Sequence, residues 1–420
     1  NELTVLENII LGFEPKKGLT IDFDKARKEV KKYIEQYHMD VQLDKKVSQI
    51  SVGEAQRVEI IKTLMRGADI IILDEPTAVL TPQEAERLFE ILNNLKQDGK
   101  SLVFISHKLN EVMAISDRIS VMRQGQYMGT VNKEETSPLD LTKRMIGREV
   151  FLNIDKAYSE AGDTILEVQD VWIPSQKETS KIRGMSLHVK AGEIVGVAGI
   201  DGNGQSELVE AITGLRKVEK GKILLCGKDI TNQSPRKVRE SGLSHIPEDR
   251  NTRGLNRAMT IEENLIAVRL DQPPFTRGIM MNKSGQDTYA KEMVEQFDIR
   301  PADYNLPTSS LSGGNAQKVV VAREVSLGNK LLVASQPTRG VDIGAIELIR
   351  NTLEKAKKAG AGVLLVSAEL EEIISLSDRI VVIHEGKITG EMRADEANEN
   401  NLGLLMMGGT DTGKDGEAAV

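Results

Sequence analysis

The chain carries the same order of sequence signals twice, and this repeat constrains its fold more than any other feature. Each copy has a short segment that contains glycine, ISVGE from Ile50 and LSGGN from Leu311. An apolar run then ends in a Pro-Thr turn, and the two prolines, Pro76 and Pro337, lie 261 residues apart. A second apolar run and an SDRI segment follow in both copies at the same offset. A constant offset over four blocks indicates a duplicated domain.

Composition narrows the class of protein. At 420 residues the chain is long enough for two sizeable hydrophobic cores. It has no run of about 18 apolar residues, so we expect no membrane-spanning helix, and any membrane role must come through a partner. The net charge of −8 argues against a nucleic-acid-binding surface. The single cysteine, Cys226, excludes a disulfide framework, fits a reducing compartment and is expected to be a buried core thiol.

The first copy, residues 1–150, has the sequence pattern of an α/β domain. Two short apolar runs rich in β-branched residues, 70–73 and 102–105, predict parallel strands separated by a helix. The predicted helices cover 23–37, 53–65 and 82–98.

The second copy, residues 163–409, follows a short polar linker at 151–162. Its runs at 165–172 and 185–199 alternate apolar and polar residues, which predicts half-buried strands of an antiparallel edge sheet. A glycine-rich loop that leads into a helix comes next. The polar tail, residues 410–420, is predicted to be disordered.

In this order, the signals resemble those of the ATP-binding cassette (ABC) ATPases, and most closely the twin-cassette ATPase subunits of bacterial importers for simple sugars and nucleosides. LSGGNAQ at 311–317 is similar to the ABC signature, and ILDEP at 72–76 is similar to a Walker B strand with its catalytic glutamate. Ser106-His107 is similar to the switch histidine after the next strand.

The resemblance covers residues 1–409 and implies an α/β fold of two ABC-type P-loop NTPase cassettes. Each cassette would have a RecA-like parallel sheet core, a helical subdomain and an antiparallel β edge subdomain. NELTVLENI at 1–9 aligns with RAMTIEENL at 257–265, about ninety residues into the second copy. We therefore expect the first cassette to be incomplete, with its phosphate-binding loop missing from a truncated sequence.

The acids of the first copy are the predicted catalytic residues. The apolar run before them places Asp74 and Glu75 at the C-terminal end of a buried strand, where ligands bind in open α/β sheets. The resemblance implies that Asp74 holds Mg²⁺ through water, that Glu75 polarises the attacking water and that His107 contacts the γ-phosphate and that water. A solvated acidic turn and a structural histidine are the simpler alternatives.

The second copy has the intact signature. Ser312 is a good N-cap, and the free backbone N–H groups at a helix start bind anions. By resemblance, this segment contacts the γ-phosphate held by the opposite cassette. The residues assigned to that contact are Leu311, Ser312, Gly313, Gly314, Asn315 and Gln317. Asp342 matches the D-loop aspartate, which would reach toward the active site, and an N-cap of a helix over 343–357 is the simpler alternative.

The remaining motifs of the second copy are altered. The loop GIDGNGQS fits GxxxxGK[ST], except that Gln205 replaces the lysine that reaches the β- and γ-phosphates. Ser335 and Gln336 replace the two Walker B acids, and Ala368 replaces the switch histidine. The nucleotide-binding residues assigned to the loop are Gly199, Gly202, Gly204, Gln205 and Ser206. Ile246–Arg250 matches the Q-loop, with Glu248 for the usual glutamine, and an exposed charged turn is the alternative.

By the resemblance, all of these alterations belong to one of the two nucleotide sites. ABC cassettes pair head to tail, so the acids of the first copy would face the intact LSGGN. The altered motifs would face ISVGE, in which Val52 replaces the first glycine and Glu54 adds a negative charge near the phosphate position. This predicts one hydrolytic site and one degenerate site, which either binds nucleotide without turnover or serves as a scaffold.

The sequence thus predicts the ATP-hydrolysing, energy-coupling subunit of an ABC importer, with ATP and Mg²⁺ as cofactors. By resemblance, its partners are transmembrane permease subunits and, through them, an extracellular substrate-binding protein, with no nucleic acid. The protein is predicted to be peripheral to the cell membrane, on its cytoplasmic face. Nucleosides are the predicted cargo, with simple sugars such as ribose or galactose as the alternative.

Two rival classes are a cytosolic twin-cassette ATPase that acts on ribosomes and a nucleotide-binding scaffold without turnover. A ribosome-acting protein usually joins its cassettes by a long charged helix, whereas residues 151–162 are few and polar. Because the first phosphate loop is missing, residues 1–420 alone are expected to show no appreciable ATPase activity.

Overall fold

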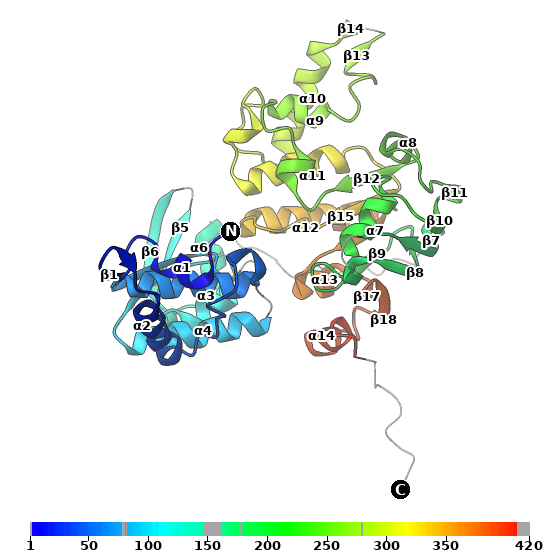
Figure 1. The fold of residues 1–420 in the computed structure, drawn as a ribbon. Helices are drawn as coiled ribbons and strands as arrows, with labels where there is room; N and C mark the ends of the chain where they lie inside the picture. Colours follow the sequence, from blue (N-terminus) through cyan, green and yellow to red (C-terminus); the bar gives the residue numbers. More distant parts are fainter. Residues whose placement is uncertain are drawn as a thin grey trace. The chain divides into compact units, whose positions relative to one another are not determined.

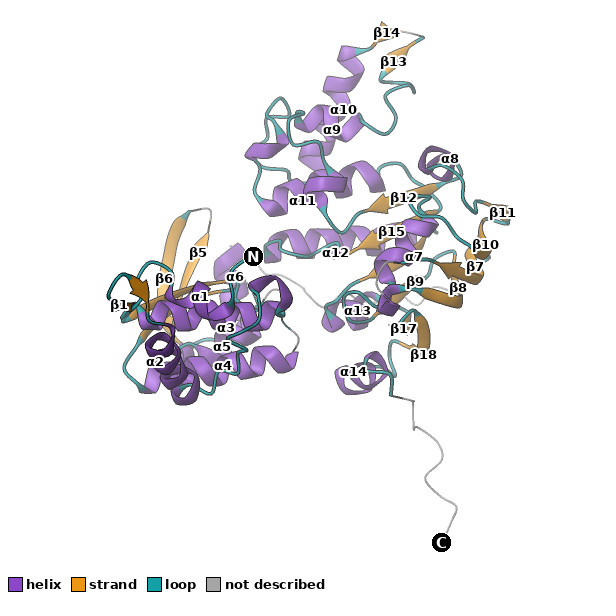
Figure 2. Cartoon of the chain, in the orientation of Figure 1, coloured by secondary structure: helices purple, strands orange, loops and turns teal. Residues whose placement is uncertain are grey.

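The computed structural model divides into two compact units, residues 1–150 and 151–420. The structure describes residues 2–77, 80, 82–106, 108–123, 125–146, 162–175, 178–278 and 280–409. The predicted tail, all of the predicted linker except Gly162, and the predicted catalytic His107 lie outside these residues. Figure 1 labels the elements along the chain, and Figure 2 distinguishes helices from strands.

The first unit has a small parallel sheet with helices around it. The strands β3 (Ile70–Asp74) and β4 (Ser101–Ile105) pair in parallel, and α4 (Pro82–Gln97) connects them, as predicted. The other helices are α1 (Val5–Ile10), α2 (Phe23–Gln36), α3 (Val52–Met65), α5 (Leu109–Ile115) and α6 (Pro138–Ile146), with 3₁₀ turns η1 (Val47–Gln49) and η2 (Lys133–Glu135). Antiparallel pairs are formed by β1 (Lys16–Lys17) with β2 (Thr20–Ile21) and by β5 (Arg118–Arg123) with β6 (Gln126–Asn132).

The core of this unit lies between the helices and one face of the β3–β4 pair. Ile71 and Leu73 are buried there, as strand periodicity requires. The alternate residues Ile70 and Ile72 are 65% and 68% exposed on the opposite face. This sheet face is therefore apolar but uncovered within the described residues.

The second unit contains a six-stranded sheet in the order β12-β15-β16-β9-β17-β18. All neighbouring pairs are parallel except the last. Its strands are β9 (Ile194–Ala198), β12 (Leu243–Ile246), β15 (Leu331–Ser335), β16 (Gly362–Val366), β17 (Arg379–His384) and β18 (Lys387–Arg393).

An antiparallel edge sheet in the order β11-β10-β7-β8 accompanies it. Its strands are β7 (Thr164–Ile173), β8 (Ile182–Lys190), β10 (Lys220–Leu225) and β11 (Lys228–Asp229), and β13 (Thr276–Arg277) pairs with β14 (Met280–Met281) in a separate hairpin. The edge sheet was predicted from residues 165–172 and 185–199, but that prediction is wrong for β9. All five residues of β9 are buried in the centre of the parallel sheet, because packed layers cover both of its faces.

The helices of the second unit are α7 (Gln205–Ile212), α8 (Pro235–Glu240), α9 (Ile261–Ile266), α10 (Lys283–Gln296), α11 (Gly313–Val325), α12 (Ile343–Lys358), α13 (Leu370–Leu376) and α14 (Glu399–Met406). Shorter turns are η3 (Glu178–Ser180), η4 (Arg250–Gly254) and η5 (Thr308–Ser310). In the described part of the chain, no helix combines the length and apolarity that crossing a bilayer requires.

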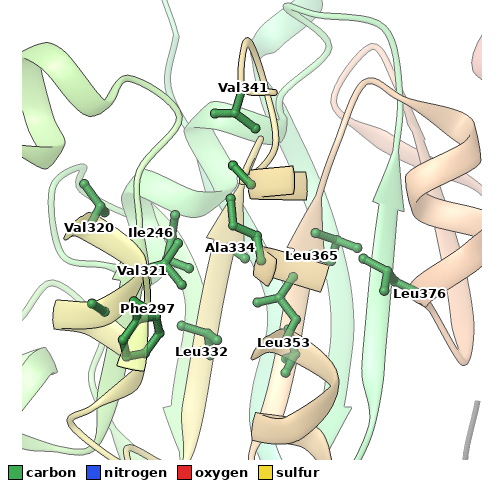
Figure 3. Close-up of a cluster of buried hydrophobic side chains, with 14 of the residues drawn as sticks. Ile246, Phe297, Val320, Val321, Leu332, Ala334, Val341, Leu353, Leu365 and Leu376 are labelled. Atoms are coloured by element: carbon green, nitrogen blue, oxygen red, sulfur yellow. The ribbon is translucent and has the colours of Figure 1, made fainter. Parts of the chain in front are cut away.

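Alternate residues of the parallel strands enter two different cores. Leu332, Ala334 and Leu365 belong to a cluster that includes Val321 of α11 and Leu353 of α12, part of which Figure 3 shows. The intervening residues of β15 and β16 pack with α7 and the edge sheet. Burial on both faces explains why these strands read as continuous apolar runs.

Cys226 does not lie in the middle of a core strand. It follows β10 in a turn, has a φ of 49° and is half-buried against the neighbouring apolar cluster. The prediction of a buried core thiol is therefore wrong, because the strand ends one residue earlier.

Candidate functional site

Two equivalent residues after the parallel strands share one backbone conformation. Glu75 follows β3 with a φ of 46°, and its N–H donates to the carbonyl of Ile105 at 2.9 Å. Gln336 follows β15 with a φ of 47°, and its N–H donates to the carbonyl of Val366 at 2.7 Å. A left-handed φ is uncommon outside glycine, and its strain tends to occur at functional sites. The two units therefore keep the same turn although the residue chemistry differs.

The acids of the first unit lie at the predicted sheet edge. Asp74 ends β3 and is exposed, whereas Glu75 is half-buried. In a parallel pair the carboxyl ends of both strands meet at one edge, so β4 delivers the segment after Ile105 to the same place. His107 belongs to that segment but lies outside the described residues.

In each unit, a glutamate in the helix after the second of two neighbouring strands (α5 after β4, α13 after β16) hydrogen-bonds the turn that follows the first strand (β3 or β15). Thr77 Oγ1 donates to Glu111 Oε2 at 2.5 Å, and Ser106 Oγ donates to the same oxygen at 3.2 Å. In the second unit Thr338 Oγ1 donates to Glu372 Oε1 at 2.7 Å, and burial raises the pKa of Glu372. Sequence analysis missed both glutamates, although their common offset of 261 residues was a usable signal.

The helix start at Ser312 has the predicted cap. Ser312 Oγ accepts the N–H of Asn315 at 3.4 Å, and α11 begins at Gly313. Leu311 lies half-buried before it. Gln317 is buried, and its Nε2 donates to the carbonyl of Pro337 at 2.8 Å. The side chain of Gln317 thus holds the turn after β15 in place.

At two positions of α11, other side chains approach the glycine so closely that a Cβ would force them to shift. A Cβ on Gly313 would lie 2.8 Å from the guanidinium Nη2 of Arg250, and one on Gly314 would lie 2.5 Å from Asp342 Oδ2. Asp342 caps α12, since its Oδ1 accepts the N–H of Ala345 at 2.9 Å, which confirms the simpler of its two predicted roles.

The glycine-rich loop after β9 enters α7 through glycines in a left-handed conformation. Gly202 and Gly204 have φ angles of 90° and 112°, which only glycine adopts readily. Gly204 caps α7 without a side-chain hydrogen bond, so the N–H groups of the first turn remain available to an anion. Gln205 Nε2 donates to the carbonyl of Ile200 at 3.1 Å and lies where a Cβ on Gly199 would collide with it.

A pocket lies beside this loop at the carboxyl edge of the six-stranded sheet. It brings the predicted loop residues Gly199, Gly202, Gln205 and Ser206 together with Ser335 and Gln336 at the end of β15. Gln336 Oε1 accepts the N–H of Ala368 at 3.1 Å, so the residues predicted to replace the second Walker B acid and the switch histidine contact each other.

Glu248 also lines this pocket and contacts the loop. Ser206 Oγ donates to Glu248 Oε2 at 3.2 Å, and Arg339 Nη1 donates to Glu248 Oε1 at 2.8 Å. Arg250 donates to the carbonyls of Arg339 and Gly340 at 2.8 and 3.2 Å, and burial lowers its pKa. The segment after β12 is therefore part of the pocket and not merely a free charged turn.

The first unit's ISVGE segment forms an ordinary capped helix start. Ser51 accepts the N–H of Glu54 at 3.2 Å, and Glu54 Oε2 accepts the N–H of Ser51 at 3.0 Å. One carboxylate oxygen of Glu54 thus takes part in a capping box.

Comparison with known proteins identifies the family. The family described as ABC transporter matches residues 1–78 and 182–339. The nucleoside import ATP-binding protein NupA of Lactococcus lactis subsp. cremoris is 48% identical over 406 residues, which cover 97% of this chain and 80% of NupA. This chain belongs to the ATP-binding proteins of ABC transporters.

A second relative supports the assignment, and a solved structure shares the fold. The guanosine import ATP-binding protein NupO of Bacillus subtilis is 46% identical over 97% of this chain and 80% of its own length. The archaeal ribosome recycling factor aABCE1, solved in complex with the ribosomal stalk protein aP1, matches 96% of this chain and 74% of its own with a TM-score of 0.64. Because that identity is 18%, the likeness shows the shared fold alone.

As a member of this family, the chain has the ABC cassette fold, binds ATP and is an ATPase subunit of the importer type. The assignment of 199–206 to an altered phosphate loop and of the start of α11 to the signature stays a prediction from the sequence motifs. The predicted α/β fold with two ABC-type cassettes is confirmed.

The residues present can accommodate a magnesium ion. Among the described residues, no three His, Cys, Asp or Glu side chains gather as a metal site. Mg²⁺ does not need such a group, since one or two carboxylates, substrate phosphates and water usually hold it. Asp74 offers a carboxylate in the first cassette, and Glu248 offers one beside the Ser206 hydroxyl in the second.

Proposed function

We propose that this protein is the energy-coupling ATPase subunit of an importer for nucleosides. The observation that carries the proposal is the 48% identity to a nucleoside import ATP-binding protein over 97% of the chain. A guanosine import protein with 46% identity over the same share supports the same cargo class. ATP binding would close the cassettes, and hydrolysis would reopen them, as in other proteins with ligand-driven domain closure.

We assign the hydrolytic chemistry to the first cassette. Glu75 would orient and polarise the attacking water, and Glu111 braces the turn that follows it through Thr77. Asp74 would hold Mg²⁺ through water, and His107 would contact the γ-phosphate. When bound, the metal ion neutralises charge on the transferring phosphate.

The signature residues Leu311–Asn315 supply the helix N-terminus that binds the γ-phosphate in this proposal. Their pairing with Asp74 and Glu75 stays a prediction from the family resemblance. Gln317 and Asp342 act through other residues, since Gln317 holds Pro337 and Asp342 caps α12.

We propose that the second cassette does not hydrolyse ATP. Ser335 and Gln336 offer neither a carboxylate for the metal nor one for the water, and Gln336 already bonds the backbone of Ala368. This cassette would bind nucleotide through its loop and transmit closure.

The proposed partners are transmembrane permease subunits and, through them, an extracellular substrate-binding protein. The chain would then lie on the cytoplasmic face of the membrane, held there by the permeases. Those partner subunits would recognise the cargo. Residues of this chain would therefore supply energy from ATP and would not determine which nucleoside is transported.

Uptake of labelled compounds by cells that depend on this protein tests the proposal. We expect Glu75→Gln to abolish uptake of labelled guanosine and adenosine, whereas Glu90→Gln on the exposed face of α4 leaves it unchanged. Uptake of labelled ribose that depends on this protein, with nucleoside uptake unaffected, would reassign the cargo to sugars.

A further inference from the structure

We infer that the β1–β2 hairpin and the solvent-facing side of α2 bind anionic phospholipids at the membrane surface. Residues 16–32 form this surface, which we call the basic hairpin face. The inference rests on the membrane location proposed above. It adds a direct lipid contact to the contact that the permeases would make.

The tip of the hairpin is apolar and uncovered. Gly18 and Leu19 form its two-residue turn, and Gly18 takes a φ of 65°, a left-handed value that such turns favour. Leu19 is fully exposed, while Ile21 and Phe23 are 42% and 44% exposed. Figure 1 shows β1 at the outer edge of the first unit. Large apolar side chains grouped in this way outside the core indicate a binding surface.

Lysine side chains lie on both sides of this tip in the sequence. Residues 16–32 contain seven Lys or Arg and three Asp or Glu, a net charge of +4 in a chain whose net charge is −8. Arg27 is tied to Asp44 at 2.5 Å. The other six cations are exposed and, among the described residues, form no ion pair: Lys16, Lys17, Lys25, Lys28, Lys31 and Lys32.

The four lysines of α2 lie on the side of the helix opposite its buried residues. Ala26 and Val30 face the core of the unit. At about 3.6 residues per turn, positions 25, 28, 31 and 32 fall on the solvent-facing side. Asp22 is engaged as the cap of α2, since its Oδ1 accepts the N–H of Lys25 at 2.9 Å. The positive side of the helix thus continues directly from the apolar hairpin.

Lysine beside apolar side chains favours a lipid surface over a protein partner. Protein interfaces are depleted in lysine and enriched in arginine and aromatic residues. Anionic membranes attract clusters of lysine, and apolar side chains next to such clusters insert at the headgroup boundary. The acids elsewhere in the chain do not cancel this attraction, because salt screens exposed charges beyond roughly 8 Å.

The hairpin of the second unit lacks this combination, although β13–β14 precedes α10 as β1–β2 precedes α2. Met280 and Met281 are 72% and 58% exposed. The lysine that follows, Lys283, donates to Glu262 Oε1 at 2.7 Å and pairs with Asp287 at 3.2 Å. The two hairpins therefore separate the effect of apolar exposure from the effect of lysine charge.

Co-sedimentation of the 420-residue chain with lipid vesicles tests the inference. We expect binding to vesicles of phosphatidylcholine mixed with phosphatidylglycerol to be at least about tenfold tighter than to phosphatidylcholine alone, and to weaken as NaCl is added. Lys16→Glu combined with Lys17→Glu should lower binding to the anionic vesicles by at least about tenfold, since each lysine near the surface contributes roughly fivefold. Leu19→Asp should lower it by about threefold or more, because the tip no longer inserts.

Matched controls come from the second unit. Lys228→Glu combined with Lys387→Glu makes the same change in net charge at exposed positions of β11 and β18, and should bind as the parent does. Met280→Asp places an acid on the other apolar hairpin and should also bind as the parent does. Circular dichroism identical to that of the parent shows that each variant is folded.

Several outcomes would overturn the lipid surface. These are equal binding to both kinds of vesicle, equal losses in the variants and the controls, or no vesicle binding by the folded chain. Loss of copurification with the permeases in the Lys16 and Lys17 double variant, without vesicle binding by the parent, would assign the surface to a protein partner instead. Nucleoside uptake tests the proposed function separately, because that function does not require the lipid contact.

Discussion

Glu75 and Gln336 share a left-handed turn but not a charge. Their φ angles are 46° and 47°, and both N–H groups bond the end of the neighbouring strand. Such a conformation costs on the order of 1 kcal/mol for a residue with a side chain. Because the second unit keeps the turn without the acid, the fold of the strand edge accounts for the conformation. The chemistry then depends on the side chain alone.

The two strand-end residues should therefore respond differently to mutation. We expect Glu75→Gln to lower ATP turnover in the assembled transporter by at least about 100-fold, because the attacking water loses its base. Gln336→Ala should change turnover little, since an amide cannot take that role. Steady-state phosphate release measures both, and equal losses would contradict the assignment of hydrolysis to one cassette.

The close approach at Gly314 gives a second prediction at this scale. Gly314→Ala places a Cβ 2.5 Å from Asp342 Oδ2, so the cap of α12 must shift, at a cost of about 1–3 kcal/mol in unfolding free energy. In α14, Gly403 has no atom within 4 Å of its Cβ position, and Gly403→Ala should stabilise by about 0.5–1 kcal/mol. Urea unfolding followed by the fluorescence of Trp172 compares the two. Equal effects of the two substitutions would be inconsistent with this packing.

At the scale of elements, a buried charge cluster joins α11 to β12. Glu324 is fully buried and pairs with Arg239 at 2.6 Å and Arg323 at 2.9 Å. Ser244 Oγ donates to the backbone carbonyl of Glu324 at 2.7 Å, and the N–H of His245 donates to the side-chain Oε2 of Glu324 at 3.2 Å. Breaking such a pair would leave a buried charge uncompensated. The signature helix and the strand that leads to Glu248 are therefore held together.

His245 makes this junction sensitive to acid. Burial lowers the pKa of His245 from 6.5 to about 4. The unfolded chain therefore takes up the proton near pH 6.5, while the folded protein resists it, so stability is full above that pH and falls as the pH drops toward 4. By linkage, about 2 kcal/mol of unfolding free energy is lost between pH 7.5 and pH 5.

We expect His245→Gln to remove this part of the pH dependence, because glutamine does not titrate. Urea unfolding monitored at Trp172 at the two pH values measures it. A variant that loses as much stability as the parent on acidification would show that other groups cause the effect.

At the scale of the whole molecule, the same strand has different surroundings in its two copies. Ile72 of β3 is 68% exposed, whereas its counterpart Val333 of β15 is fully buried. Val333 packs in the core formed with Leu208 of α7 and Val168 of β7. Equivalent sequence therefore does not imply equivalent burial, because the layer that covers the face decides it.

A matched pair of substitutions tests this difference. Val333→Thr buries a hydroxyl and should cost about 1–3 kcal/mol in the unfolding free energy of the second unit. Ile72→Thr should change the stability of the first unit by no more than about 0.5 kcal/mol. Trp172 fluorescence reports the second unit, and hydrogen exchange of α4 and β4 reports the first. A large loss from Ile72→Thr would mean that its sheet face is covered in solution.

Much of the architecture was predictable from local pattern. The helices around 23–36 and 82–97 and the strands at 70–74 and 101–105 lie within a few residues of their predicted bounds. The failure at β9 has a physical cause. Gly196 interrupts an apolar run, so the segment looks like an alternation of apolar and polar residues. A Cβ at this position would lie 2.2 Å from Ser377 Oγ. The glycine therefore permits close packing and does not face water.

The sequence by itself determined the duplication, the element types and the position of the acids after a strand, because periodicity and motif spacing are local properties. Only the tertiary structure decided that Glu248 reaches Ser206, 42 residues away, and that Glu111 braces Thr77, 34 residues away. Those contacts depend on which strands are neighbours in the sheet. Neighbour order follows from burial of both sheet faces by segments distant in the chain, and no short pattern records it.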